Sequence, residues 1–87
     1  MHELHAFVNI FVDASLMDEV IENLSKMDNV EEIYEVTGEF DIVTLIWASD
    51  IESLSDVLKN RIMKIKGIKS TVTSIILSPY KRAKCAT

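Results

Sequence analysis

The 87-residue chain has very little of the material that builds cross-links and irregular loops: it contains one cysteine, one proline and two glycines. A single cysteine can form neither an internal disulfide nor a cysteine-based zinc site, so we expect Cys85 to be a bystander thiol. Two glycines are too few for a glycine-rich phosphate-binding loop, and no stretch has the composition of a linker. The sequence therefore predicts one domain at residues 1–78, with a tail at 79–87 and no cofactor.

Long hydrophobic runs are also missing. The longest nearly uncharged apolar runs lie at residues 6–12 and 42–48, far short of the roughly 18 residues that cross a bilayer. The first three residues, Met-His-Glu, lack the positive charge that opens a signal peptide. We therefore expect a cytoplasmic protein that makes no membrane contact.

Basic residues are scarce in the first part of the chain. Residues 1–56 hold all 14 acidic residues and a single basic one, Lys26, whereas residues 57–87 hold the other eight of the nine basic residues. The formal net charge is −5, and only six residues are aromatic. A nucleic-acid-binding protein typically has a basic surface with aromatic contacts, so we expect no direct DNA binding.

Metal-binding and catalytic residues are few as well. The two histidines, His2 and His5, are three residues apart where a strand is predicted, so their side chains point to opposite faces. A zinc protease instead places two histidines four residues apart on a helix. We therefore expect no metal site and no catalytic residues. One enzyme alternative stays open, in which His5 faces a pocket on the sheet as in small dimeric barrel oxygenases and isomerases.

Hydrophobic periodicity predicts the order of the elements. Alternating apolar residues predict strands at 4–12, 30–36, 40–48 and 68–77, and stripes with helical spacing predict helices at 15–27 and from 51 to a stop at Gly67. Ser49 and Glu52 form a capping-box pattern at the second helix. Strand, helix and strand occur twice in succession. This order predicts an α+β, ferredoxin-like βαββαβ fold, in which a four-stranded antiparallel sheet carries two helices on one face.

The first and third strands, expected at the centre of the sheet, are apolar on both faces. In the first strand, Phe7 and Phe11 alternate with other apolar residues. Since the helices cover only one face, an apolar face is left open, and such a face usually marks an association surface. We therefore expect two chains to pack sheet to sheet, as a dimeric α/β barrel.

Two polar segments have chemistry that suits a small ligand. The amides of the turn at 37–41 can hold a carboxylate, and Asp41 can hold an ammonium group. Thr71 and Thr73 share one face of the last strand and offer hydroxyl groups. Ordinary hairpin chemistry explains the turn more simply than a ligand does, and β-branched edge residues explain the threonines. The residues alone therefore favour a structural role, and the ligand-binding interpretation stays open at this point.

The two segments together resemble a known family. The block VTGEFDIVTL at 36–45, an acidic helix, and the block IKGIKSTVTSIIL at 65–77 are similar to the effector-binding domain of the leucine-responsive/asparagine regulator (Lrp/AsnC) transcription factors. The resemblance spans residues 5–77. It implies a ferredoxin-like domain without enzymatic activity that dimerises through its sheets, assembles into a higher oligomer, and binds a free amino acid between dimers.

The start of the chain differs from the full members of this family. Full regulators carry a helix-turn-helix domain before the effector domain, whereas here the first strand starts within about five residues of Met1. The similarity therefore implies a stand-alone module that modulates transcription or amino-acid metabolism through oligomerisation or partner proteins, with full-length Lrp/AsnC regulators as candidate partners. An amino-acid-binding regulatory domain of the ACT type is the alternative within this fold.

The resemblance also implies the positions of the ligand-binding residues. The residues that match the family's effector pocket are Gly38, Glu39, Phe40 (where the family often has tyrosine), Asp41, Thr71, Thr73 and Ser74.

Overall fold

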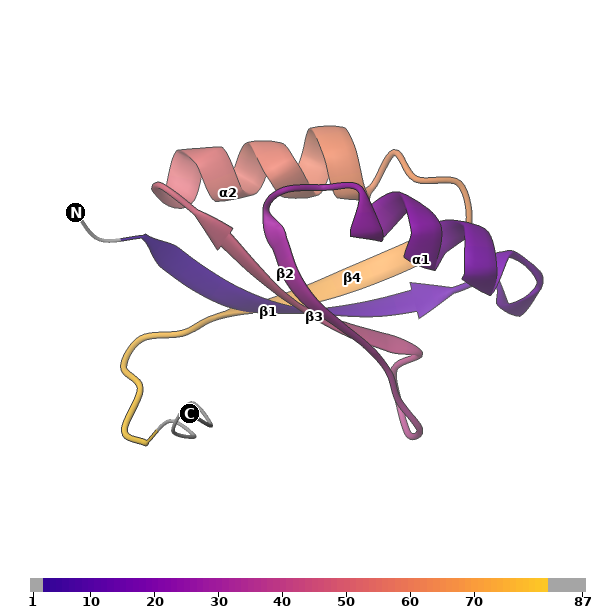
Figure 1. Cartoon of the computed structure of the whole chain (residues 1–87), viewed down its shortest axis with the longest axis horizontal. Coiled ribbons are helices and arrows are strands. Elements are labelled where there is room, and N and C mark those ends of the chain that lie inside the picture. Colours follow the sequence, from indigo (N-terminus) through magenta and orange to yellow (C-terminus); the bar gives the residue numbers. More distant parts are fainter. Residues whose placement is uncertain (1–2, 82–87) are drawn as a thin grey trace, which may run out of the picture.

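A computed structural model describes residues 3–81, which fold into a four-stranded antiparallel sheet with two helices on one face (Figure 1). The sheet order is β2-β3-β1-β4. The α+β, ferredoxin-like prediction is therefore confirmed, and β1 and β3 occupy the centre. In chain order the elements are β1 (Leu4–Val12), a 3₁₀ turn (Ala14–Leu16), α1 (Met17–Ser25), β2 (Val30–Glu35), β3 (Ile42–Ala48), α2 (Ile51–Val57), a π-helical turn (Leu58–Ile62) and β4 (Ile68–Ile75).

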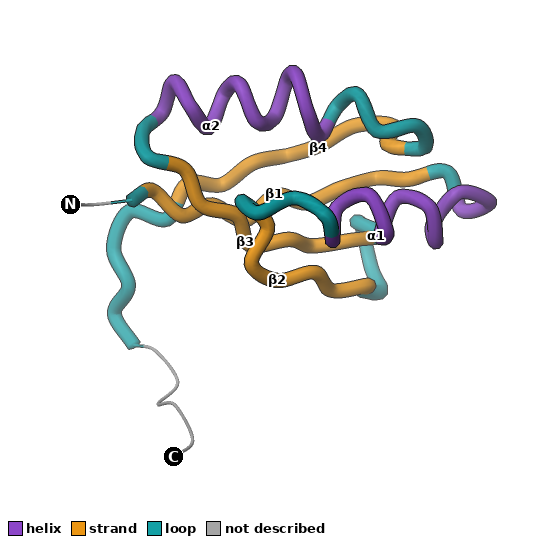
Figure 2. The backbone as a smooth tube through the Cα atoms, turned by 45° about the horizontal axis from the view of Figure 1, so that its top comes forward, coloured by secondary structure: helices purple, strands orange, loops and turns teal. Residues whose placement is uncertain are grey.

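The core lies between the sheet and the two helices. Alternate residues of β1 and β3 are buried on this side, and they pack against apolar residues that α1 and α2 direct at the sheet. Figure 2 shows both helices lying over the same face. The only buried polar side chain in the described residues is Thr44, whose hydroxyl donates to the carbonyl of Val8 at 3.2 Å. The fully buried apolar residues are Ala6, Val8, Ile10, Val20, Leu24, Ile42, Ile46 and Ile62.

The start of α2 differs from the capping box expected at Ser49. Asp50 is the N-cap: its backbone is extended, and its carboxylate accepts a hydrogen bond from the Ser53 amide at 2.7 Å. This hydrogen bond lowers the pKa of the Asp50 carboxyl below its ordinary value. The prediction was wrong by one residue because a charged acceptor makes the stronger cap. The helix also begins with Ile51 in solvent, at 65% exposure, so the expected apolar stripe starts later.

The turn before β4 packs closely against α1. Gly67 has a φ of +105°, and its carbonyl accepts a hydrogen bond from the Asp13 amide at 2.8 Å. A Cβ atom on Gly67 would lie 2.8 Å from Val20 Cγ2 and 2.9 Å from Leu16 Cβ. The helical segment ends at Ile62, before Gly67, so the expected stop at Gly67 was wrong. Gly67 is instead needed in the turn that follows, because the left-handed backbone and the lack of space both exclude a side chain.

Beyond β4 the chain leaves the sheet. The strand ends at Ile75, two residues before the predicted end, and the amide of Ile76 makes one further hydrogen bond to the carbonyl of His5 at 2.8 Å. The residues at 77–81 are exposed and irregular. Residues 82–87 of the basic tail, which include Cys85, lie outside the described residues. No helix within residues 3–81 is long and apolar enough to cross a membrane.

Candidate functional site

The turn at 36–41 projects from the sheet on the side away from the helices (Figure 1). The amide of Val36 closes it by donating to the carbonyl of Asp41 at 3.0 Å. Gly38 has a φ of +107°, and a Cβ atom there would meet no atom within 4 Å. Gly38 and Glu39 are exposed. The tip of the hairpin is therefore exposed, and no atom of the described chain packs where a Gly38 side chain would lie.

Asp41 joins this turn to β1. Its Oδ2 atom accepts a hydrogen bond from the amide of Val12 at 2.9 Å, and its own amide donates to the carbonyl of Ile10 at 3.0 Å. Val12 lies where the pairing of β1 with β4 shifts register, after Phe11. The Asp41 side chain therefore supplies the partner that an irregular strand end needs. Within residues 3–81, Oδ1 accepts no hydrogen bond and stays available to a ligand.

Phe40 packs on the open face of the sheet. Its ring contacts that of Phe11, with 4.8 Å between the centroids and an angle of 48° between the planes. Phe11 alternates with Ile10 and Val12, which are buried under the helices, so Phe11 points the other way. The turn is thus anchored to β1 by two contacts, the hydrogen bond from the Val12 amide to Asp41 and the aromatic contact between Phe40 and Phe11.

The predicted residues of β4 do not all share one face. Thr71 and Thr73 pair with Ile10 and Val8, two core residues, so both threonines lie on the helix side and are half-buried. The Thr71 hydroxyl makes a weak contact with the Met63 sulfur at 3.8 Å. The expectation that the two threonines share a face is confirmed.

Ser74 lies on the opposite side of the sheet from the threonines. It pairs with Phe7, which is 43% exposed on the open face. The predicted pocket therefore has parts on both sides of one sheet: the turn and Ser74 lie on the open side, and the threonines lie on the helix side. A single chain does not bring these parts together into one pocket.

A hollow lies on the open face beside His5, where the enzyme alternative placed a pocket, but the glutamates that line it were not predicted from the sequence. It has a volume of about 590 Å³, and it is lined by His5, Phe7, Glu31, Glu32, Leu45, Ile76, Pro79 and Lys81. His5 Nε2 lies 3.4 Å from Glu31 Oε1. The pairing of β2 with β3 shifts register between Val30 and Glu32, so both glutamates border the hollow. Simple alternation cannot predict such a bulge, which explains why no sequence pattern placed the two glutamates beside His5.

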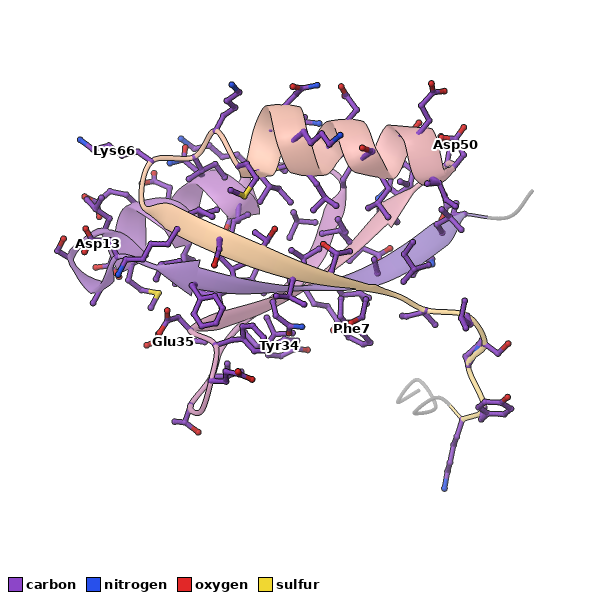
Figure 3. All side chains as sticks on the ribbon, turned by 180° about the vertical axis from the view of Figure 1, so that it is seen from behind. Phe7, Asp13, Tyr34, Glu35, Asp50 and Lys66 are labelled. Carbon is purple, nitrogen blue, oxygen red and sulfur yellow. The ribbon has the colours of Figure 1, made fainter. Side chains whose placement is uncertain are left out.

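The open sheet face exposes large apolar side chains, as the two-sided hydrophobicity of the central strands predicts. Phe7, Tyr34 and Val72 are 43%, 55% and 48% exposed, and Figure 3 shows Phe7 and Tyr34 on the side away from the helices.

Within residues 3–81, no group of three or more His, Cys, Asp or Glu side chains is placed to hold a metal ion. His5 does face a hollow, as the enzyme alternative requires, but its charged neighbours there are two glutamates and a lysine.

These features define a small ferredoxin-like domain with an uncovered sheet face and a polar turn at one end of it. The chain belongs to the Lrp/AsnC ligand binding domain family, whose sequence model matches residues 5–84. It is 40% identical over 63 residues to the HTH-type transcriptional regulator LrpA of Pyrococcus horikoshii, covering 72% of this chain and 45% of that protein. It is 28% identical over 79 residues to the regulator Ptr1 of Methanocaldococcus jannaschii, covering 91% of this chain and 53% of that protein.

Solved structures show the same fold. Escherichia coli AsnC superimposes with a TM-score of 0.90 at 29% identity, over 94% of this chain and 56% of that one. TTHA0845 of Thermus thermophilus has a TM-score of 0.84 at 32% identity, over 91% of this chain and 99% of that one. The feast or famine regulatory protein of M. tuberculosis, complexed with L-methionine, has a TM-score of 0.82 at 31% identity, over 95% and 56%.

The chain spans about half the length of the curated relatives that it matches. These relatives are named as transcriptional regulators, and the family is one of ligand-binding domains rather than of enzymes. Family membership therefore decides against the barrel enzyme and against the ACT-type alternative. The resemblance that the two sequence blocks suggested is confirmed.

Proposed function

We propose that this domain binds a free amino acid and transmits that binding to a regulatory process through oligomerisation or partner proteins. The observation that carries the proposal is the family match over residues 5–84, together with the 31% identical M. tuberculosis protein, whose structure holds L-methionine. Full-length Lrp/AsnC regulators are the candidate partners. The expected cytoplasmic location and the expected lack of direct DNA binding belong to the same proposal.

The turn and the threonines have the chemistry that a zwitterion requires. An ammonium group needs acceptors, which Asp41 Oδ1 and the Glu39 carboxylate offer, and a carboxylate needs donors, which the turn amides and the hydroxyls of Thr71 and Thr73 offer. Phe40 adds an apolar surface for the ligand's side chain. Because these groups lie on opposite sides of one sheet, we propose that a second copy completes the pocket, so that the turn of one copy faces the threonines of another.

The open sheet face supports a homodimer. Exposed Phe7, Tyr34 and Val72 form an apolar surface that water would cover in a single chain. We propose that two copies pack these faces together, which also places Ser74 at the interface beside Phe7 rather than in the amino-acid pocket. Assembly of such dimers through their other surfaces then brings a turn and a threonine pair together.

A thermal-shift screen against the twenty amino acids tests the proposed function directly. A ligand present at a hundred times its dissociation constant adds about 2.7 kcal/mol to the folded state, and each kcal/mol raises the melting temperature of a domain of this size by roughly 4–8 °C. We expect one amino acid, or a few of related side-chain chemistry, to give a shift above about 10 °C. If none of the twenty shifts the transition at millimolar concentration, the proposed function is wrong.

Substitutions at Asp41 then test the site. Asp41→Asn keeps an oxygen that can accept the Val12 amide, so we expect stability within about 1 kcal/mol of the original chain, and a loss of roughly 1.5–3 kcal/mol in amino-acid binding when the charge is removed. Asp41→Ala also leaves the half-buried Val12 amide without its partner, and this costs about 1–3 kcal/mol of stability. Asparagine is therefore the cleaner test.

Calorimetric titration of the best amino acid measures the loss. Glu35→Gln is the matched control, because it removes an exposed carboxylate from the neighbouring β2 without touching the turn. Thr73→Val tests the second half of the pocket while keeping a β-branched side chain in β4. Unchanged affinity in both Asp41→Asn and Thr73→Val would place the pocket elsewhere, even if the thermal screen succeeds.

A further inference from the structure

Asn9 is a polar side chain in the middle of the open apolar face. It alternates along β1 with Val8 and Ile10, which are buried under the helices, so the Asn9 side chain lies on the open side of the sheet. In the sheet register its neighbours are Val43 of β3 and Val72 of β4. An amide therefore occupies a position that has apolar side chains on both neighbouring strands.

This position is also close to the centre of the sheet. The pairings of β1 with β3 and with β4 overlap between Ala6 and Ile10, where β1 has a hydrogen-bonded strand on each side. Within this overlap, Phe7 and Asn9 are the residues on the open face. Two sheets that cover each other's apolar faces meet over this central part. A second copy packed on the open face therefore covers Asn9.

The Asn9 amide has no hydrogen-bond partner in the described part of the chain. No buried side-chain nitrogen or oxygen lacks a partner within residues 3–81, so this amide is open to water in a single chain. His5, the other polar residue of β1 on this face, differs because its Nε2 lies 3.4 Å from Glu31 Oε1. A second sheet on this face removes the water from Asn9. A buried amide without a hydrogen bond is strongly unfavourable, so the second copy must supply a partner.

An asparagine amide is complementary to another copy of itself, because its oxygen accepts hydrogen bonds and its NH₂ group donates them. In a dimer with two-fold symmetry, a residue near the axis lies opposite the same residue of the other chain. Stacked sheets lie about 10 Å apart. Two extended asparagine side chains span this separation when a hydrogen bond of about 2.9 Å joins them.

We propose that Asn9 of one copy hydrogen-bonds to Asn9 of a second copy across the two-fold axis of the sheet-packed dimer, and that this pair fixes the alignment of the two sheets. The inference rests on the homodimer of the proposed function and names the residue that determines its geometry. Apolar side chains tolerate many alignments, whereas an alignment that separates the two amides buries both without partners. A single buried asparagine sets the register of a coiled coil for the same reason.

The Asn9 pair also determines which chains associate. A related chain with an apolar residue at the facing position leaves the Asn9 amide buried and unpaired, and this penalty disfavours the mixed dimer. We therefore expect this chain to prefer its own copy over a relative that has an equally apolar open face but no amide at the axis.

Opposite charges at position 9 test the pairing. In the homodimers of Asn9→Asp and of Asn9→Lys, like charges face each other across the interface, which should raise the dissociation constant of each dimer at least about a hundredfold. Sedimentation of either variant alone should therefore show monomers at a protein concentration at which the original chain is dimeric. An equimolar mixture should recover dimers, because a carboxylate then faces an ammonium group.

The matched controls are Asn23→Asp and Asn23→Lys, which make the same changes at an exposed position of α1 on the helix side. Both should dimerise as the original chain does. Either Asn9 variant dimerising as tightly as the original chain would show that Asn9 lies outside the interface. A mixture no more dimeric than its components would place a different residue opposite Asn9. Each result would overturn the inference and leave the homodimer itself intact.

Asn9→Leu provides a test without charge, which decides the question if circular dichroism shows that the charged variants are unfolded. This variant should dimerise at least as tightly as the original chain, because it buries no amide. When it is mixed with the isotopically labelled original chain and the subunits have exchanged, native mass spectrometry should find mixed dimers well below the half that random pairing gives. A mixed fraction of one half would contradict the inference.

The original chain provides the remaining comparison. If it sediments as a monomer at all accessible concentrations, both the homodimer and the Asn9 pair are wrong. The thermal-shift screen on the same chain reports amino-acid binding separately from this result.

Discussion

The two glycines offer a matched pair of substitutions, because their backbones are nearly alike and their surroundings are opposite. Gly38 has a φ of +107° and Gly67 has a φ of +105°. A methyl group on Gly38 would meet nothing within 4 Å, whereas one on Gly67 would lie 2.8 Å from Val20 Cγ2 and 2.9 Å from Leu16 Cβ. Replacing each by alanine therefore separates backbone strain from steric overlap.

The expected magnitudes follow from this geometry. An L-residue held in a left-handed conformation costs roughly 1–2 kcal/mol, of which the stiffer unfolded chain returns about 0.4–1 kcal/mol. Gly38→Ala should therefore lose about 1 kcal/mol of unfolding free energy. Gly67→Ala adds an overpacking cost of about 1–3 kcal/mol, for a total of roughly 2–4 kcal/mol. The Cβ of Leu16 cannot rotate away, because its position is set by the backbone, so the start of α1 must shift.

Thermal and urea unfolding of both variants, at one fixed protein concentration, measures the difference. A domain of 87 residues has a total stability of roughly 4–13 kcal/mol at about 0.05–0.15 kcal/mol per residue. Gly67→Ala should therefore lower the melting temperature by at least about 8 °C, at roughly 4–8 °C per kcal/mol. Gly38→Ala should lower it by about 4–8 °C. Equal losses in the two variants would show that the turn before β4 does not pack on α1 as described.

Three further predictions concern the α2 cap, the open face and the buried hydroxyl. The hydrogen bond from Ser53 lowers the pKa of Asp50, so the carboxylate's contribution to stability is complete above the ordinary value of 3.8 and is lost as the pH falls through the lowered value. The difference in melting temperature between the original chain and Asp50→Ala should therefore shrink as the pH falls from neutral to below that value. A constant difference would contradict the charged cap. Phe7→Glu should give a folded monomer by light scattering and circular dichroism, because Phe7 is already 43% exposed in one chain; a variant that stays dimeric would place the interface elsewhere. Thr44→Val should lose about 1 kcal/mol in urea unfolding, since the bond to the Val8 carbonyl disappears, and a more stable variant would show that this hydroxyl is not needed.

The fold could be predicted from the sequence, because hydrophobic periodicity follows directly from which side chains must leave water. The alternation of β1 predicts Leu4–Val12, the range that the structure shows. Repetition of the strand-helix-strand unit predicted the sheet order, since right-handed crossovers leave β1 and β3 in the centre. The two blocks around Gly38 and Thr71 were also sufficient to indicate the family.

The placement of the candidate residues could not be predicted in this way, because it depends on contacts between segments far apart in the chain. The Asp41 side chain bonds to Val12, 29 residues away, which makes it part of the fold as well as a candidate ligand contact. The sides of the sheet on which Thr71 and the turn lie depend on strand register, and the bulge at Glu31 follows no alternation. Register and bulges arise from packing across strands. For this reason the sequence of one chain could name candidate pocket residues without showing that they lie on opposite sides of the sheet.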